Sequence, residues 1–131
     1  MGKPAAKQGD KVMATDTHIV MIPSPGGPVP TPLPHPFVGT LDGSLAKDVN
    51  IEGKPAAVVG STATNTPAHI PQGGPFQKPP ADRGTVLQGS ATVFIGGKPA
   101  ARAGDPATTC NDPADLPAGQ IIAAGTVLIG G

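Results

Sequence analysis

The sequence predicts a mainly β domain of three hairpin repeats around a pseudo-threefold axis, with long Pro- and Gly-rich loops and little helix. The first observation behind this prediction is that the string Gly-Lys-Pro-Ala-Ala occurs three times, beginning at Gly2, Gly53 and Gly97. The second is that apolar residues alternate at the period of a strand before the two later copies. A fixed unit that recurs in this way indicates one supersecondary element used three times.

Each repeat reads as a strand, a tight glycine turn, a Pro-Ala-Ala return strand and a second turn. In the third repeat, residues 93–96 are the first strand, and Gly97 can take the positive φ that a two-residue hairpin turn requires. The paired alanines keep the return strand thin, so the copies can approach one another closely. The repeat units are predicted near residues 2–10, 49–61 and 93–105.

The two ends of the chain carry the two halves of one of the three hairpin repeats. Residues 127–131, Val-Leu-Ile-Gly-Gly, match residues 93–97, Val-Phe-Ile-Gly-Gly, but no Pro-Ala-Ala follows them. Residues 2–6 begin the chain with the missing half. We therefore expect the C-terminal strand 126–131 to pair with the N-terminal segment, which would make residues 1–131 a single domain.

The composition limits the size of any conventional core. The chain has 19 Gly and 18 Pro among 131 residues, no Trp or Tyr, and three Phe. Such a composition is common in disordered chains, but the exact repeats and the Val- and Ile-containing strands favour an ordered structure. We expect the Pro-rich residues 23–36 to form extended coil packed on the β structure.

Charge and targeting signals narrow the functional classes. The formal net charge is zero, and no basic stripe or series of stacking aromatic residues is present, which argues against nucleic acid as a partner. The sequence has neither a secretory signal nor an apolar run long enough for a stable membrane anchor, so we expect synthesis in the cytoplasm. A single cysteine, Cys110, excludes a disulfide within the chain.

Four residues form a candidate metal site. Three histidines and one cysteine make up the ligand set of a closed tetrahedral zinc site. His18 and His69 each lie 16 residues after the first glycine of their repeat, and Cys110 lies 13 residues after Gly97. Equivalent positions in threefold-related units surround the axis, and His35, held between two prolines, would join them from the first connection. The predicted cofactor is a structural Zn²⁺ bound by His18, His35, His69 and Cys110.

Other functions of these residues stay open at this point. Histidines in loops are usually exposed and bind nothing, and a lone cysteine is usually a small buried apolar residue. A hydrolytic zinc site keeps one position open for water, whereas Cys110 as the fourth ligand would close the site, so we expect no enzyme. The main alternative is a small zinc-dependent or Cys-His hydrolase delivered as a toxin. A metal-free structural or adhesive β-repeat protein is a third hypothesis.

The repeated Gly-Lys-Pro-Ala-Ala, with Arg102 after the third copy, resembles the proline-alanine-alanine-arginine (PAAR) repeat proteins. The arginine position holds Lys7 and Val58 in the other two copies, and Ser61 replaces an aspartate. The resemblance implies a cone-shaped β protein that sharpens the spike of a contractile injection system, such as a type VI secretion system or a phage-tail-like particle. It implies the same zinc ligands, near the vertex of the cone.

The resemblance also implies a partner and a location. The broad base of the cone would sit on a trimeric spike protein of the valine-glycine repeat type, with one copy per trimer, and effector proteins are further expected partners. The assembled tip would pierce a membrane and be expelled outside the cell or into a target cell. The residues expected at the base are Pro4, Ala5, Pro55, Ala56, Val93, Ile95, Pro99, Ala100, Val127 and Ile129.

Overall fold

The computed structural model describes residues 2–130, and this range contains strands, turns and loops but no helix, which confirms the mainly β prediction. None of these residues therefore belongs to a helix that is long and apolar enough to cross a membrane. The strands in chain order are β1 (Lys3–Pro4), β2 (Lys11–Ile22), β3 (Val29–Gly43), β4 (Asn50–Ile51), β5 (Lys54–Pro55), β6 (Thr62–Asn65), β7 (Arg83–Val86), β8 (Phe94–Ile95), β9 (Lys98–Pro99), β10 (Pro106–Thr109), β11 (Leu116–Ile122) and β12 (Leu128–Ile129).

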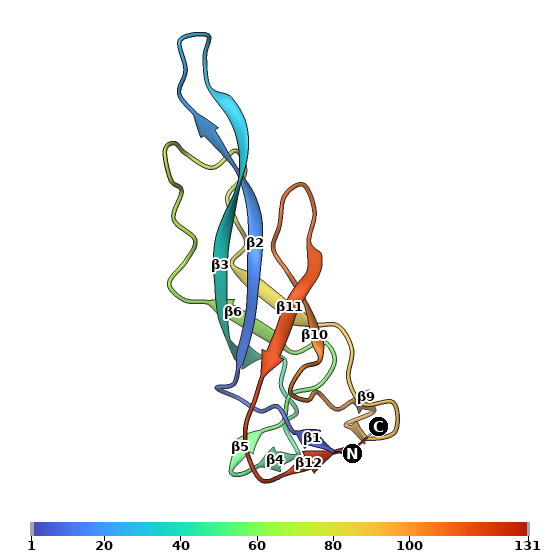
Figure 1. Ribbon diagram of the computed structural model, residues 1–131. Coiled ribbons are helices and arrows are strands. Elements are labelled where there is room, and N and C mark those ends of the chain that lie inside the picture. The colour runs from blue at the N-terminus through green and yellow to red at the C-terminus, as the bar shows by residue number, and fades with distance from the viewer. Residues whose placement is uncertain (1, 131) are drawn as a thin grey trace.

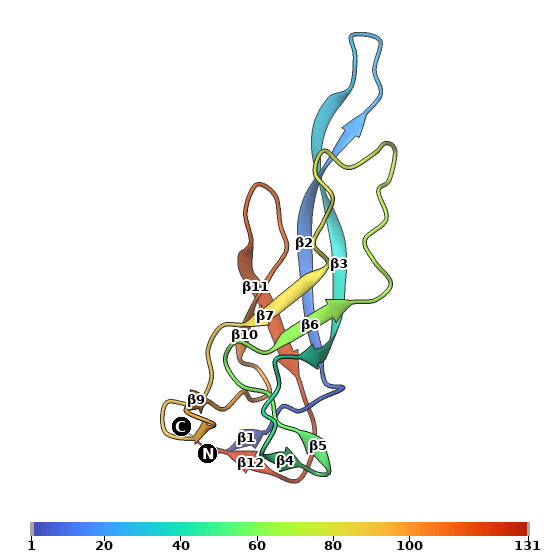
Figure 2. The same ribbon diagram turned by 180° about the vertical axis from the view of Figure 1, so that it is seen from behind.

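Six of the strands close into a small barrel, and the other six form three short hairpins beneath it. The barrel order is β10-β11-β2-β3-β6-β7, and all its strand pairs are antiparallel. Strands β2 and β3 form one long hairpin that extends well beyond the other barrel strands (Figure 1). The molecule therefore narrows from the hairpin base, where both chain ends lie, to the β2–β3 turn, as the reverse view also shows (Figure 2).

The three base hairpins have matching registers. Lys54 pairs with Ile51 and Lys98 with Ile95, while in the third hairpin Lys3 pairs with Ile129 from the other end of the chain. Glu52 and Gly53, with φ of 51° and 82°, form the turn between β4 and β5. Both central residues have positive φ, as in the tight turn that suits the twist of a two-stranded hairpin.

A closed ring of backbone hydrogen bonds joins the three repeats at their second alanine. The N–H of Ala6 donates to the carbonyl of Ala101, that of Ala101 to Ala57, and that of Ala57 back to Ala6, each over 3.0 Å. All three alanines are fully buried. A larger side chain at any of them would push the strands apart, so the repeated alanine allows the close approach that these bonds need.

Two positions that differ between the repeats, three residues apart, change together. Lys7 lies 3.4 Å from Asp10 and Arg102 lies 3.0 Å from Asp105, so two of the repeats contain a cation and an aspartate three residues apart. In the remaining repeat the corresponding residues are Val58 and Ser61. The Ser61 hydroxyl accepts the Val58 N–H over 2.9 Å, as the aspartates do in the other repeats. Replacing both residues together avoids a buried carboxylate without a partner cation.

The Pro-rich segment differs from the expectation of extended coil. Residues 29–43 form strand β3, and prolines occupy every second position from Pro30 to Pro36. Alternate residues of a strand direct their N–H groups to the same edge, so the missing donors all fall on one side. The other side pairs with β2, whereas β6 joins β3 only from Gly39 onward. The alternate spacing of the prolines therefore makes a strand possible here.

The core is correspondingly thin and divided. The larger cluster fills the barrel around Phe37, Leu41 and Ile121, which are each at most 1% exposed. The smaller cluster lies in the base and contains three alanines together with Ile51 and Ile129. Neither cluster reaches the upper part of the β2–β3 hairpin, above Phe37, where the buried side chains are those of Asp16, His18, Val20 and His35.

Candidate metal centre

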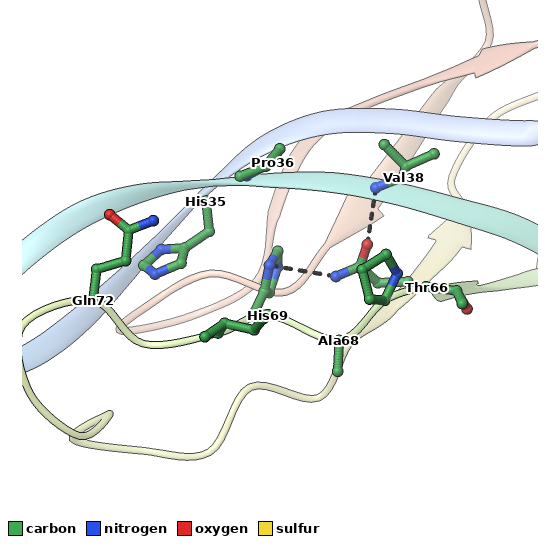
Figure 3. Close-up of a pocket in the computed structure, with 10 residues that line it drawn as sticks. His35, Pro36, Val38, Thr66, Ala68, His69 and Gln72 are labelled. Atoms are coloured by element: carbon green, nitrogen blue, oxygen red, sulfur yellow. Dashed lines mark hydrogen bonds between the residues drawn. The ribbon is translucent and has the colours of Figure 1, made fainter.

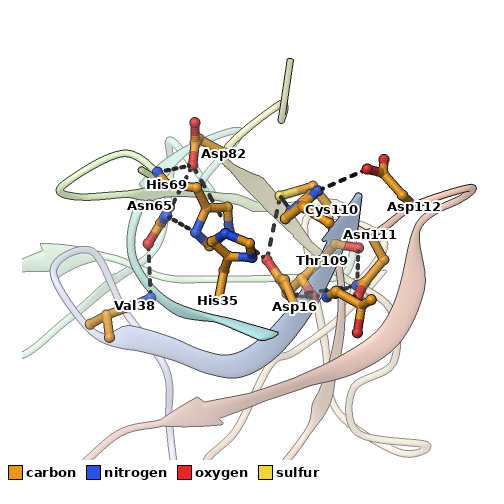
Figure 4. Close-up of polar contacts among 12 residues, drawn as sticks. Asp16, His35, Val38, Asn65, His69, Asp82, Thr109, Cys110, Asn111 and Asp112 are labelled. Atoms are coloured by element: carbon orange, nitrogen blue, oxygen red, sulfur yellow. Dashed lines mark hydrogen bonds and ion pairs between the residues drawn. The ribbon is translucent and has the colours of Figure 1, made fainter. Parts of the chain in front are cut away.

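The predicted ligands come from four different parts of the chain. His18 lies on β2, His35 on β3, His69 in the loop of residues 66–82 that follows β6, and Cys110 directly after β10. All four side chains are buried, with exposed fractions between 1% and 9%. Figure 4 shows His35, His69 and Cys110 close together, and the contacts of His18 with His35, His69 and Cys110 place it beside them.

The three imidazole rings pack around a common centre. The ring centroids of His18 and His69 are 4.8 Å apart, and the centroid of His35 lies 5.6 Å from the first and 5.5 Å from the second. Phe76 covers His18 and His35 with centroid distances of 5.9 and 5.3 Å. This aromatic cover keeps the polar groups of the centre away from water on that side.

The outer ring nitrogens contact groups of the protein. Nδ1 of His35 donates to the carbonyl of Leu33 over 2.9 Å, and Nδ1 of His69 lies 3.3 Å from the side-chain nitrogen of Asn65. Nδ1 of His18 faces a carboxylate oxygen of Asp112 at 3.6 Å, longer than a hydrogen bond. Contacts of this kind orient the histidines of metal sites and leave Nε2 for the ion.

The donor atoms of His18, His69 and Cys110 lie within 4.8 Å of one another, close enough to hold one ion, and His35 is not part of that group. Nε2 of His18 is 3.6 Å from Sγ of Cys110, and Nε2 of His35 is buried without any hydrogen-bond partner. For tetrahedral zinc, bond lengths of 2.0–2.3 Å put neighbouring donor atoms about 3.3–3.6 Å apart. An unpaired buried nitrogen is costly, so its presence at this point fits a site that holds an ion.

A fifth residue, Asp16, joins the centre and was not identified from the sequence. Its side chain is fully buried, and its donor atom lies within 4.8 Å of those of His18, His69 and Cys110. Asp16 precedes His18 by two residues on β2 and is the direct partner of His35 on β3. The strand period of two was therefore the sequence signal that could have placed Asp16 with the histidines.

Two more carboxylates support the ligand-bearing segments. Oδ1 of Asp82 accepts the backbone N–H of His69 over 2.9 Å and a side-chain N–H of Asn65 over 3.0 Å, which fixes the loop that carries His69. Asp112 accepts the N–H of Ile19 over 2.9 Å beside His18. Within residues 2–130, neither carboxylate, nor that of Asp16, pairs with a lysine or arginine. This local excess of negative charge favours a cation at the centre.

Burial controls the protonation of two predicted ligands. Burial lowers the pKa of His18, with the neighbouring His69 adding to the effect, so the ring is held in the neutral form that binds a metal. Burial, followed by the charge of Asp16, raises the pKa of Cys110 to about 12. Without a metal the sulfur is therefore a neutral thiol, and a bound cation would convert it to a thiolate.

A cavity of about 260 Å³ leads from the surface to the imidazole side of the centre (Figure 3). His35 and His69 lie along it, together with mainly apolar residues such as Pro36, Val38 and Ile70.

The structure divides the predicted base residues into buried and accessible ones. Ala5, Ala56, Ala100 and Ile129 are at most 5% exposed and pack inside the base, while Pro4, Pro55 and Pro99 lie in β1, β5 and β9 at intermediate exposure. Ile95 and Val93 are partly buried against the same cluster, and Val127 is 39% exposed.

The largest exposed apolar side chains of the base hairpins were not among the predicted residues. Phe94 on β8 is 57% exposed, and Leu128 on β12 is 60% exposed. They occupy equivalent positions, because each lies between the two apolar residues of its Val-x-Ile strand. The third equivalent position is Asn50 on β4.

Comparison with known protein families gives a match that includes the third repeat. The family model described as the PAAR motif matches residues 77–131, which include the third repeat and Cys110. A search of curated proteins finds no match. The string Gly-Lys-Pro-Ala-Ala, which lies within this match at residues 97–101, occurs twice more, at residues 2–6 and 53–57, and the alanine ring joins the three copies. Residues 77–131 of this chain are therefore similar to proteins of the PAAR motif family.

Proposed function

We propose that this protein is a zinc-stabilised tip that caps and sharpens the trimeric spike of a contractile injection system. The machine would be a type VI secretion system or a phage-tail-like particle, and the tip would aid membrane piercing and effector delivery. The PAAR motif is the family feature that suggests a spike tip. The observation that carries the proposal is that three imidazoles and one thiol meet in a buried centre above a threefold base.

Zinc fits the donor set. Imidazole nitrogen and thiolate sulfur are its common ligands in structural sites. His18, His35, His69 and Cys110 would hold the ion, which would crosslink β2, β3, the loop of residues 66–82 and the end of β10. The upper part of the molecule has little apolar core, so this crosslink would replace it. A structural ion of this kind stabilises small domains strongly.

The base fits a threefold partner. Its three hairpins have the same register, and a ring of equal hydrogen bonds relates them. A single chain with this pseudo-symmetry can present similar contacts to each subunit of a trimer. We propose that a trimeric valine-glycine repeat spike covers the base and that Phe94 and Leu128 are the main apolar contacts. The assembled tip would leave the cytoplasm with the spike.

The alternative of a Cys-His hydrolase has less support. A nucleophilic cysteine needs a lowered pKa and access to substrate, whereas the pKa of Cys110 is raised to about 12 and its side chain is buried. Glu52, the only glutamate in the chain, accepts the backbone N–H of Thr126 over 2.9 Å in the base, where it holds two segments together. These contacts favour a structural function for both residues.

Two measurements test the proposal. Elemental analysis of the purified protein should give one zinc per chain, and the His69→Ala variant should lose it. The full chain should also bind a purified trimeric valine-glycine repeat spike protein from the same source, at one chain per trimer. A metal-free wild type would contradict the zinc centre. Failure to bind the trimer at micromolar concentration would contradict the role as a spike tip.

A further inference from the structure

Asp16 is the least expected member of the metal centre. Its carboxylate is fully buried, and the two oxygens have different surroundings. Oδ1 accepts the hydroxyl hydrogen of Thr109 over 2.6 Å and lies 3.5 Å from the side-chain nitrogen of Asn111. These contacts fix the carboxylate from the side that faces β10.

The second oxygen faces the metal ligands. Oδ2 of Asp16 lies 3.0 Å from Nε2 of His69 and 3.4 Å from Sγ of Cys110. Both contacts are made to the inner atoms that a metal would use. Oδ2 is therefore where a ligand oxygen would be, while Oδ1 has the position of an oxygen held by supporting hydrogen bonds.

We infer that Asp16 is itself a metal ligand, so that the centre has five donors: three imidazole nitrogens, the Cys110 thiolate and Oδ2 of Asp16. This inference rests on the proposed zinc centre and extends it. The ion would replace the hydrogens that now lie between Oδ2 and its two neighbours.

The charge of the centre supports a direct role for Asp16. A divalent ion with one thiolate and three neutral imidazoles carries a net positive charge, and the Asp16 carboxylate makes the group neutral. Burying a neutral group costs less free energy than burying either charge alone. The hydrogen bonds from Thr109 and Asn111 do not by themselves require a carboxylate, because an amide oxygen could accept them as well.

The wild-type protein provides the first test. X-ray absorption at the zinc edge counts donors and separates sulfur from nitrogen or oxygen. We expect four nitrogen or oxygen donors and one sulfur. Three nitrogen or oxygen donors and one sulfur in the wild type, with the same count in the Asp16→Asn variant, would overturn the inference and leave the proposed zinc centre intact. A wild type that binds no zinc would remove both.

The Asp16→Asn variant provides the second test, with Asp112→Asn as a matched control. Both changes remove one carboxylate charge near His18, but Asp112 contacts the outer nitrogen, at 3.6 Å. Loss of an outer contact costs about 10–100-fold in metal affinity. We expect Asp112→Asn to stay within that range and Asp16→Asn to exceed it, measured by competition with a chelator.

Cobalt(II) in place of zinc separates a ligand from a neighbour of a ligand. Four-coordinate Co²⁺ absorbs visible light more strongly than five-coordinate Co²⁺. The Asp16→Asn variant should therefore show stronger visible bands than the wild type, while Asp112→Asn should keep the wild-type bands. Bands that are the same in all three proteins would overturn the inference. Circular dichroism of each metal-free variant shows whether it still folds. If a variant does not fold, the donor count from the zinc edge of the wild type tests whether Asp16 is a ligand.

Discussion

Asp16 and His35 are direct partners in the β2–β3 ladder, so one step across the sheet brings a carboxylate and an imidazole to the same centre. His18 follows two residues after Asp16 on the same face of β2. A slip of one residue in this ladder would turn the side chains of one strand to the opposite face. The long, regular pairing of β2 with β3 is therefore what holds three of the five candidate donors together.

Metal removal should destabilise the protein. If zinc is present at about 1,000 times its dissociation constant, binding adds about 4 kcal/mol to the free energy of unfolding. Chelation should remove that amount, which thermal or urea unfolding would measure. In the His69→Ala variant the same chelator should have little effect. An unchanged melting temperature of the wild type after verified metal loss would contradict a stabilising role.

Acid should destabilise the metal-free protein. The pKa of His18 is lowered by burial from its ordinary value of 6.5, so below that pH the unfolded chain binds a proton that the folded protein resists. Stability should therefore hold its full value above about pH 6.5 and fall as the pH decreases below it. Urea unfolding at a series of pH values measures this, and His18→Asn should reduce the slope. A rise in the free energy of unfolding as the pH decreases below about 6.5 would contradict this prediction.

Cys110 should react slowly in the folded, metal-free protein. A rise in its pKa from 9.0 to about 12 reduces the thiolate fraction near neutral pH about 1,000-fold, and burial slows the reaction further. Alkylation by iodoacetamide, followed by mass spectrometry, should be slow in buffer and fast in denaturant. Equal rates in the two conditions would mean that the thiol is accessible and ionised.

Because Val58 and Ser61 differ together from the other repeats, a second substitution at Val58 should restore stability that a substitution at Ser61 removes. Ser61→Asp places a carboxylate at a fully buried position without its partner cation and should cost about 1–3 kcal/mol of stability. Adding Val58→Arg restores the pair seen at Arg102 and Asp105, and a cavity of about 240 Å³ beside Val58 offers room for the longer side chain. Chemical denaturation of both variants measures the effect. A double variant less stable than Ser61→Asp would contradict this account.

Charged substitutions at the exposed apolar residues of the base should weaken its binding to the trimeric spike. Phe94→Asp and Leu128→Asp should each weaken binding to the trimeric spike at least tenfold, because each would bury an unpaired charge in the interface. Leu116→Asp is the matched control, since Leu116 is 49% exposed on β11, away from the base. Binding is measured by interferometry with the immobilised trimer. Equal losses for all three variants would argue against docking through the base.

The repeats allowed much of the base to be predicted from the sequence. Identical strings must form similar local structures, so three copies of Gly-Lys-Pro-Ala-Ala predicted three hairpins and the turn glycine Gly97, whose φ is 82°. The barrel could not be predicted in this way. Its strands lie between the repeats and share only dipeptides, such as Ala-Thr in β2, β6 and β10. In addition, β3 contains prolines, which usually argue against a strand.

Residue type alone was enough to select four of the candidate ligands from the sequence, but it could not identify the fifth. Histidine and cysteine are rare in this chain and stand out as ligands, so His18, His35, His69 and Cys110 were selected together. Aspartate is common in turns, and Asp16 therefore carried no such signal. Its role depends on the register of β2 with β3, and that register is set by long-range pairing.

The alanine ring also fixes how many copies this architecture can contain. Each of its three N–H groups and each of its three carbonyls already has a partner, so the circle has no open position. A solenoid can lengthen by adding a unit at either end, because its terminal units keep free edges. Here a fourth copy would have nothing to join, and deleting one would break two of the three links.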